Sequence, residues 1–244
     1  TYSATPGPGG LYPTQLTNPD YSWESNRKLE LALDLGFFKD RLQVNTSWYR
    51  NRSSNQLVGY PLPAITGFST VQANLDATVE NRGWELEVST INLHTDRWRW
   101  ETSINLSFPE NTLVSFPGID QTSYANIYTV GEPLNIQKLY RYTGLDAETG
   151  LYTVADVNDD GTLDFEDRVV QQNLGRTAFG GIRNQITYGK LTLDFLWEYV
   201  EQEGKRYFPT TSMGRFGNVL QEDYDQRWIM AGDDNGVQRA SRGI

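Results

Sequence analysis

The 244-residue sequence contains no cysteine and only one histidine. The lack of cysteine excludes disulfide frameworks, thiolate zinc sites and cysteine nucleophiles. No apolar run approaches the ~18 residues that a membrane-spanning helix needs, which excludes a helical membrane protein. Positive charge is also scarce, because 21 Lys and Arg stand against 31 Asp and Glu and give a net charge of −10. We therefore expect no nucleic-acid partner, since nucleic-acid binding relies on an excess of positive charge.

The sequence also lacks the short motifs that carry common enzyme chemistry. It has no serine-nucleophile motif, no zinc motif and no phosphate-binding glycine loop. The single histidine, His94, lies in an expected turn at residues 94–97, where a solvated turn residue is the simplest interpretation. Paired carboxylates of the glycosidase kind are the remaining enzyme possibility, but the acidic residues have other expected roles, described below. We predict that the protein is not an enzyme.

Aromatic residues are abundant, at 13% of the sequence, and many stand in segments where apolar and polar residues alternate. Alternation with a period of two is the pattern of a β-strand with one apolar and one polar face. The alternating segments form three pairs, each joined by a tight turn, and the pairs are separated by the long intervals 52–82 and 109–178. The predicted hairpins are residues 28–36 with 41–51, residues 84–90 with 98–108, and residues 182–188 with 191–199.

This arrangement predicts an all-β fold of antiparallel, up-and-down strands. If neighbouring strands pair, every tight turn lies at one rim of the sheet and every long connection at the other. Outer-membrane β-barrels have this asymmetry, with short periplasmic turns and long extracellular loops. The faces agree, because charged residues share one face and Leu, Val, Ile, Phe and Trp share the other. A soluble sheet with one face on a core gives the same alternation, and periodicity alone does not choose between the two.

Residues 156–167 have the spacing of a calcium-binding loop. In such loops oxygen ligands occupy positions 1, 3, 5, 7, 9 and 12, and glycine occupies position 6. The six predicted Ca²⁺ ligands are Asp156, Asn158, Asp160, Thr162 (through its carbonyl), Asp164 and Asp167, with Gly161 at the sixth position. Asp167 departs from the pattern, in which the twelfth residue is a longer Glu. The alternative is a metal-free loop of Asx-turns, which the same residue types also form.

The surroundings of this loop indicate what bound calcium would do. In calcium sensors, ion binding moves the two helices that flank the loop. No helical periodicity flanks residues 156–167, so we expect no such movement here. The loop lies instead in the long interval 109–178, which costs conformational entropy to order. We predict that Ca²⁺ acts there as a static clamp.

Several stretches of the sequence resemble the C-terminal half of the SusC-like TonB-dependent outer-membrane transporters of Bacteroidetes. The similar stretches follow one another in that family's order over most of residues 18–232. They are NPDYSWES at 18–25, LDLGFF at 33–38, WYR at 48–50, VENRGWEL at 79–86, TGLD at 143–146, the acidic loop of residues 156–167 running into Arg168, FGGI at 179–182, and Arg227-Trp228.

The resemblance implies a partial outer-membrane β-barrel with long extracellular loops, belonging to a barrel of about 22 strands that holds a plug. Residues 1–244 would then lack the plug, the N-terminal strands and the final strands, and residues 109–178 would be a long extracellular loop that contains the calcium-type loop 156–167. It also implies import of an oligosaccharide or peptide across the outer membrane of a Gram-negative bacterium. The TonB complex would drive import, a SusD-like surface lipoprotein would act as the lid, and outer-membrane lipid would surround the apolar face.

An alternative from another class of protein stays open at this point. A soluble extracellular calcium-binding β module could bind glycans through exposed aromatic side chains such as Tyr124, Tyr128 and Tyr140. A requirement for detergent separates this module from a membrane barrel.

Overall fold

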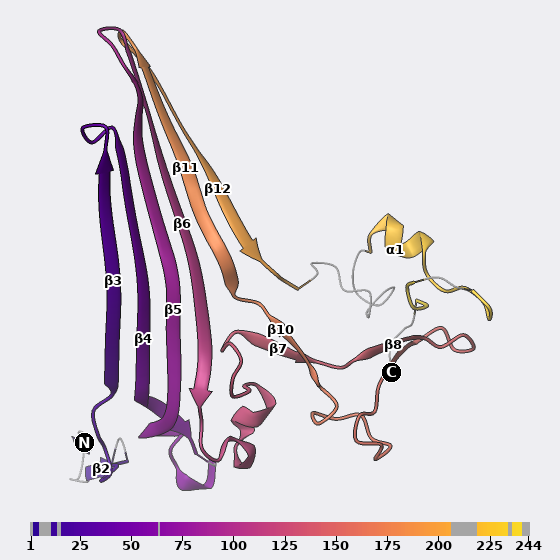
Figure 1. Ribbon diagram of the computed structural model, residues 1–244. Coiled ribbons are helices and arrows are strands. Elements are labelled where there is room, and N and C mark those ends of the chain that lie inside the picture. The colour runs from indigo at the N-terminus through magenta and orange to yellow at the C-terminus, as the bar shows by residue number, and fades with distance from the viewer. Residues whose placement is uncertain are drawn as a thin grey trace. The chain divides into compact units, whose positions relative to one another are not determined.

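The computed structural model describes residues 2–4, 11–13, 16–62, 64–205, 219–233 and 236–240. The chain divides into two units, one made of Thr1–Leu134 with Arg176–Gln202 and the other of Asn135–Gly175 with Glu203–Ile244. A six-stranded antiparallel sheet makes up most of the first unit (Figure 1). No helix in these described ranges has the length and apolar character needed to cross a membrane.

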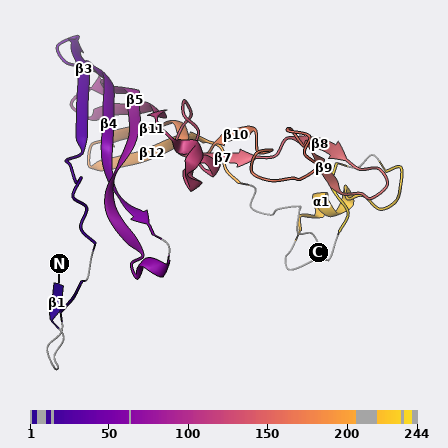
Figure 2. The ribbon, with the colours of Figure 1, turned by 90° about the horizontal axis from the view of Figure 1, so that it is seen from below.

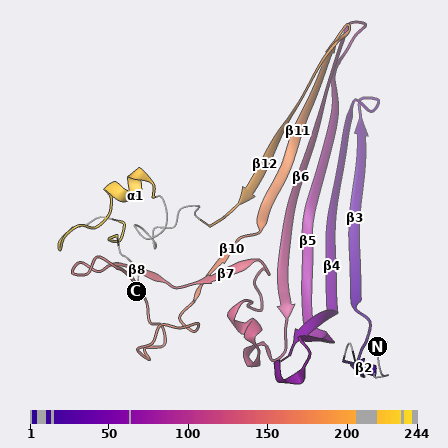
Figure 3. The same ribbon diagram turned by 180° about the vertical axis from the view of Figure 1, so that it is seen from behind.

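The strands of this sheet follow the order β12-β11-β6-β5-β4-β3. Their bounds are β3 (Ser25–Phe37), β4 (Leu42–Pro61), β5 (Thr70–His94), β6 (Trp98–Ser115), β11 (Arg176–Tyr188) and β12 (Leu191–Gln202). The three predicted hairpins are confirmed as β3–β4, β5–β6 and β11–β12, and their tight turns lie at the same end of the sheet (Figures 1 and 3). In the last turn Gly189 has a φ of 60°, which glycine adopts without steric cost.

The predicted interval 52–82 between the first two hairpins is wrong. Strands β4 and β5 stay paired as far as Pro61 and Thr70, and a short connection that contains the 3-10 turn η1 (Ala64–Thr66) joins them (Figure 2). The register of β4 with β5 shifts between Ser54 and Gln56, and nearby the register of β5 with β6 shifts between Thr78 and Val79. Each bulge changes which residues share a face, so the period-two pattern on which the prediction depended is lost although the pairing continues.

The predicted bounds of the next interval, 109–178, are also too wide. Strand β6 continues past Pro109 to Ser115, and β11 begins at Arg176. Pro109 has no N–H to donate to a neighbouring strand. Because β11 pairs with β6 only as far as Ser107, no hydrogen bond between β6 and β11 is lost at Pro109. The connection therefore runs over residues 116–175.

A small hydrophobic core lies at the end of the sheet away from the tight turns. It is built on Ala77, Val79, Leu113 and Phe116, and residues of η2 (Ile119–Gln121) and η3 (Ser123–Asn126) pack against it. The chain returns to the β6 backbone here, because Leu113 N donates to Glu132 O (2.9 Å) and Gly131 N donates to Leu113 O (2.8 Å). The first part of the long connection is thus held against the sheet.

The second unit consists of short elements. Strand β7 (Ile136–Leu139) pairs with β10 (Val170–Asn173), and β8 (Tyr142–Leu145) pairs with β9 (Tyr152–Val154). The short helix α1 (Gln221–Asp225) completes the unit. Separately, near the start of the chain, β1 (Tyr2–Ala4) pairs with β2 (Leu11–Pro13).

Candidate functional site

One face of the six-stranded sheet carries a continuous band of exposed apolar side chains. Cross-strand pairing places Leu35, Val44, Val88 and Ile104 side by side across four strands. Other members of the band are large and far from buried, with Leu31, Leu193 and Trp197 exposed by 62%, 59% and 67%. A face of this kind needs an apolar surrounding, because burial of each such side chain contributes about 1.5–3 kcal/mol.

Aromatic side chains bound the apolar band at both ends. Trp48 pairs with Trp84 and Trp84 with Phe108 at one end, while the rings of Trp98 and Tyr188 meet at the other, with centroids 4.5 Å apart. Residues 98 and 108 both belong to β6, and ten residues of strand span about 33 Å. At the usual barrel tilt this length gives a height of ~25 Å, the height of the apolar band of outer-membrane barrels.

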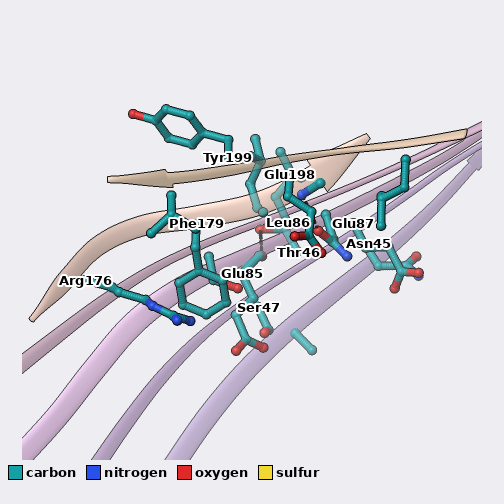
Figure 4. Close-up of a pocket in the computed structure, with 18 of the residues that line it drawn as sticks. Asn45, Thr46, Ser47, Glu85, Leu86, Glu87, Arg176, Phe179, Glu198 and Tyr199 are labelled. Atoms are coloured by element: carbon teal, nitrogen blue, oxygen red, sulfur yellow. Dashed lines mark hydrogen bonds between the residues drawn. The ribbon is translucent and has the colours of Figure 1, made fainter. Parts of the chain in front are cut away.

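The opposite face of the sheet is polar and is hollowed. A hollow of about 800 Å³ lies over all six strands, and Figure 4 shows Ser47, Glu85 and Phe179 among its lining. Its charged lining residues are Asp34, Glu85, Glu87, Glu198 and Arg176. Four carboxylates against one guanidinium make this surface attractive to cationic groups and repulsive to anions.

Arginines elsewhere on the polar face are neutralised by neighbouring carboxylates. Arg183 on β11 donates from Nε to Oδ1 of Asp194 on β12 at 3.0 Å, and its Nη2 donates to the other carboxylate oxygen. Arg99 donates from Nη2 to Oε1 of Glu101 at 2.6 Å on β6. The negative charge of the hollow therefore stays uncompensated by these arginines.

The tyrosines proposed for glycan binding pack against other parts of the protein. Tyr124 and Tyr128 pack on the small core, with ring centroids 6.1 Å apart. The guanidinium carbon of Arg168 lies 5.0 Å from the ring centroid of Tyr140, and all three tyrosines are half-buried. The prediction that they are exposed is wrong, because the long connection folds onto itself and onto the sheet. His94, by contrast, is exposed at the end of β5, as predicted.

The predicted calcium ligands lie together in one compact loop that is held by its own hydrogen bonds. Gly161 N donates to Asp156 Oδ2 (2.8 Å), and Thr162 N donates to Asp160 Oδ1 (2.7 Å). Glu166 N donates to Asp164 Oδ1 (2.8 Å) in the same manner. The last two bonds are Asx-turns, so the loop has local structure that its Asp residues favour with or without a metal.

Asp167 closes this loop. Its side chain is fully buried, and its two oxygens accept hydrogen bonds from Val157 N (2.7 Å) and Asp164 N (3.0 Å). The backbone N–H groups of Asp164 and Val157 stabilise the charged carboxylate and hold the pKa of Asp167 below its ordinary value, although burial opposes them. The residue at the twelfth position therefore joins the two ends of the loop.

The donors of the loop suit Ca²⁺ in their chemistry, since all are oxygens and most are charged. Asp156 Oδ1 is buried and accepts no hydrogen bond from the described residues, so one oxygen stands ready for a cation. Both oxygens of Asp160 and Asp167 accept hydrogen bonds within the loop. Within the described ranges, no three His, Asp or Glu side chains are arranged to hold a metal ion. Calcium binding therefore stays a prediction.

The sequence has relatives among the TonB-dependent receptors. Residues 1–148 match the family model described as TonB dependent receptor-like, beta-barrel. The chain is 29% identical over 188 residues to TonB-dependent receptor P39 of Formosa agariphila, and 24% identical over 266 residues to TonB-dependent receptor P26 of the same organism. These alignments cover 75% and 95% of this chain but 18% and 26% of the relatives. The chain thus spans about a fifth to a quarter of their length.

Solved structures share its fold. The structure of the RagAB peptide transporter matches with a TM-score of 0.71 and 20% identity, over 100% of this chain and 29% of that chain. The RagAB peptide importer in the closed-closed state matches equally well, with a TM-score of 0.71 and 21% identity. The predicted fold class, an all-β partial barrel of antiparallel strands, is confirmed.

Proposed function

Because this chain belongs to the TonB-dependent receptor-like β-barrel family, we propose that it forms part of the wall of an outer-membrane nutrient importer. The two-faced sheet carries this proposal, since it has an apolar band bounded by aromatic residues on one side and a polar, hollowed face on the other. Strands β3 and β12 are the edges of the sheet. Further strands must pair with both edges in lipid, because unpaired backbone groups are too costly there.

We infer that the transported substrate is an oligosaccharide or a peptide. The resemblance to SusC-like transporters supports this substrate class, as does the likeness to the RagAB peptide transporter. The polar hollow would then face the lumen, where its carboxylates would contact polar or cationic groups of a plug or a substrate. The proposed role is binding and passage without covalent chemistry, so no catalytic residue is assigned.

We further propose that the protein lies in the outer membrane of a Gram-negative bacterium of the Bacteroidetes. A SusD-like lipoprotein would cover its extracellular side, and the TonB complex would act through parts of the protein outside this chain. The receptors of Formosa agariphila and the likeness to the RagAB peptide transporter support this assignment.

Two adjacent residues of β12 test the membrane placement. In the full-length protein that contains this sequence, Trp197→Cys on the apolar face should resist a water-soluble maleimide, whereas Glu198→Cys on the polar face should react. The chain itself contributes no background, because it has no cysteine. Similar reaction rates at the two positions in intact membranes would contradict the proposal.

Deleting the gene should also abolish uptake of the nutrient peptide or oligosaccharide, and unchanged uptake would refute the transport role.

We also propose that residues 156–167 bind Ca²⁺ and stiffen the connection between β6 and β11. Asp156→Asn keeps an oxygen for the N–H of Gly161 but removes the negative charge, so it should weaken terbium binding about tenfold, because affinity follows the ligand charge. Asp146→Asn is the matched control, since Asp146 Oδ1 also accepts from backbone N–H groups, those of Glu148 and Thr149, but outside the loop. Luminescence titration of the full-length protein measures both variants, and no saturable binding below millimolar calcium would refute the site.

A further inference from the structure

Charged side chains on the apolar face begin directly beyond one of its aromatic borders. Cross-strand pairing places residues of β3, β4, β5 and β6 side by side in rows, and one such row contains Trp48, Trp84 and Phe108. The next two rows on the same face, farther from the tight turns, contain four arginines and two glutamates. We name this set the arginine band; its members are Arg27, Arg50, Arg52, Glu80, Arg82 and Glu110.

The arginine band keeps an excess of positive charge. Arg50 Nε and Arg52 Nε both donate to the same oxygen, Glu80 Oε2, at 2.9 and 2.8 Å. Arg82 Nη2 donates to Glu110 Oε1 at 2.6 Å. The Glu80 side chain is 8% exposed, whereas Arg50 and Arg52 are each 42% exposed. One carboxylate thus orients two guanidinium groups whose outer parts stay open to a further anion.

The depth of the arginine band matches the headgroup layer of a membrane. Each row lies two residues beyond the previous one, a step of about 6.6 Å along the strand, or ~5 Å in height at the usual barrel tilt. The polar layer on each side of the hydrocarbon core is roughly 5–8 Å thick. The band lies at the end away from the tight turns (Figure 1), which is the extracellular end of an outer-membrane barrel. The first row, ~5 Å beyond the aromatic border, therefore falls among the headgroups of the outer leaflet, and the second row, at ~10 Å, lies at their outer edge.

We propose that the arginine band binds the phosphate groups of the glycolipid of the outer leaflet, lipid A. Guanidinium groups form paired hydrogen bonds with phosphate oxygens, and their orientation by Glu80 lowers the entropy lost on binding. Such a contact would fix the vertical position of the barrel in its membrane. The inference rests on the proposed placement in the outer membrane and not on the identity of the imported substrate.

Native mass spectrometry of the full-length protein with diphosphoryl lipid A tests this site. The double variant Arg27→Gln, Arg82→Gln removes two positive charges and leaves Glu80 with both of its arginines. Its affinity for diphosphoryl lipid A should fall about tenfold or more, because hydrogen bonds between charged groups are the strong ones. Monophosphoryl lipid A should bind more weakly than the diphosphoryl form, and phosphatidylcholine should not compete. Arg99→Gln is the control, because it breaks one ion pair on the polar face.

Equal lipid A affinity in the double variant and the unmodified protein would overturn the assignment, as would an equal loss in Arg99→Gln. Displacement of the lipid by inorganic phosphate at the same concentration would show a site for free phosphate and would also overturn it. The cysteine pair on β12 keeps this result separate from the proposed function. If Trp197→Cys is protected but the double variant Arg27→Gln, Arg82→Gln still binds lipid A normally, only the proposed lipid site is refuted. If the two cysteines react alike, the membrane placement itself is refuted.

Discussion

Replacement of Gly180 by alanine is expected to break the normal pairing of β11 with β6. A Cβ atom at residue 180 would lie 2.1 Å from the carbonyl oxygen of Asn105 and 2.9 Å from Leu106 Cδ2. The carbonyl belongs to the backbone of the neighbouring strand, so the contact is relieved only if the two strands separate. We expect a loss of roughly 2–3 kcal/mol in the free energy of unfolding, together with less folded protein in the outer membrane.

The heat-modifiable electrophoretic mobility of the full-length protein, followed by denaturant unfolding, measures both effects. Gly59→Ala is a matched control in β4, because its added Cβ would meet Thr70 at 3.6 Å, an ordinary van der Waals distance. The control should fold to the level of the unmodified protein. If Gly180→Ala gave the same folded fraction and the same unfolding midpoint as Gly59→Ala, the close approach of β11 to β6 would be refuted.

A second glycine in the family-like stretches has a related explanation. A Cβ atom at Gly83 would lie 2.7 Å from Tyr49 Oη and 2.8 Å from Phe108 O. Glycine at this position lets the Tyr49 side chain lie across β5. The stretches VENRGWEL and FGGI indicate a family from the sequence alone, but the reason for their glycines depends on the neighbouring strands and becomes visible only in three dimensions.

The hairpins could be predicted because each strand has one face that must avoid water. Leu31, Trp48 and Trp84 occupy matching positions on three strands, and the structure pairs them as neighbours. A shift of one residue would turn every apolar side chain to the polar face, so the pattern determines the register as well as the strand. Where both faces of β4 are polar, as at Arg52, Ser53 and Ser54, the same reasoning has no signal, and the extension of the hairpin was missed.

Pairing between distant short segments could not be predicted either. Strands β7 and β10 have four residues each and are separated by about thirty residues of chain, and segments this short show no clear period. The arginine band did have a signal that was overlooked. Arg50 stands two positions after Trp48, and Arg82 stands two positions before Trp84. Both arginines therefore lie on the same face as these tryptophans, and their charge marks the end of the apolar band.

The acidic loop shows the same division between what spacing determines and what packing determines. The spacing of Asp156, Asn158 and Asp160 places these side chains in one loop, where Asp156 and Asn158 accept hydrogen bonds from the backbone of Gly161 and Asp160, and their role as Ca²⁺ ligands stays a prediction. The role of Asp167 was not predictable, because its burial and its two backbone donors depend on how tightly the loop closes. A carboxylate in the twelfth position of a calcium pattern thus serves here to join the ends of the loop.

Asp167→Ala is expected to open the loop between residues 156 and 167. The substitution leaves the N–H groups of Val157 and Asp164 without their acceptor in a partly buried position, and loss of a hydrogen bond to a charged acceptor is costly. Amide hydrogen exchange at residues 157 and 164 should become about tenfold faster or more. The experiment is done on the full-length protein with a chelator present, so that loss of a bound metal does not contribute. Glu166→Ala, which changes an exposed neighbouring acid, should leave exchange at both amides nearly unchanged.

The same contacts predict the direction of a pH effect. Because the pKa of Asp167 is lower in the folded loop than its ordinary value, about 3.9 in an unstructured chain, the carboxylate contributes stability above that pH. This contribution is lost as the pH falls through the lower, folded pKa. Protection of the Val157 and Asp164 amides should therefore decrease below about pH 4 in the unmodified protein, and it should be low at every pH in Asp167→Ala. Protection that was equal in the two proteins at neutral pH would show that other contacts close the loop.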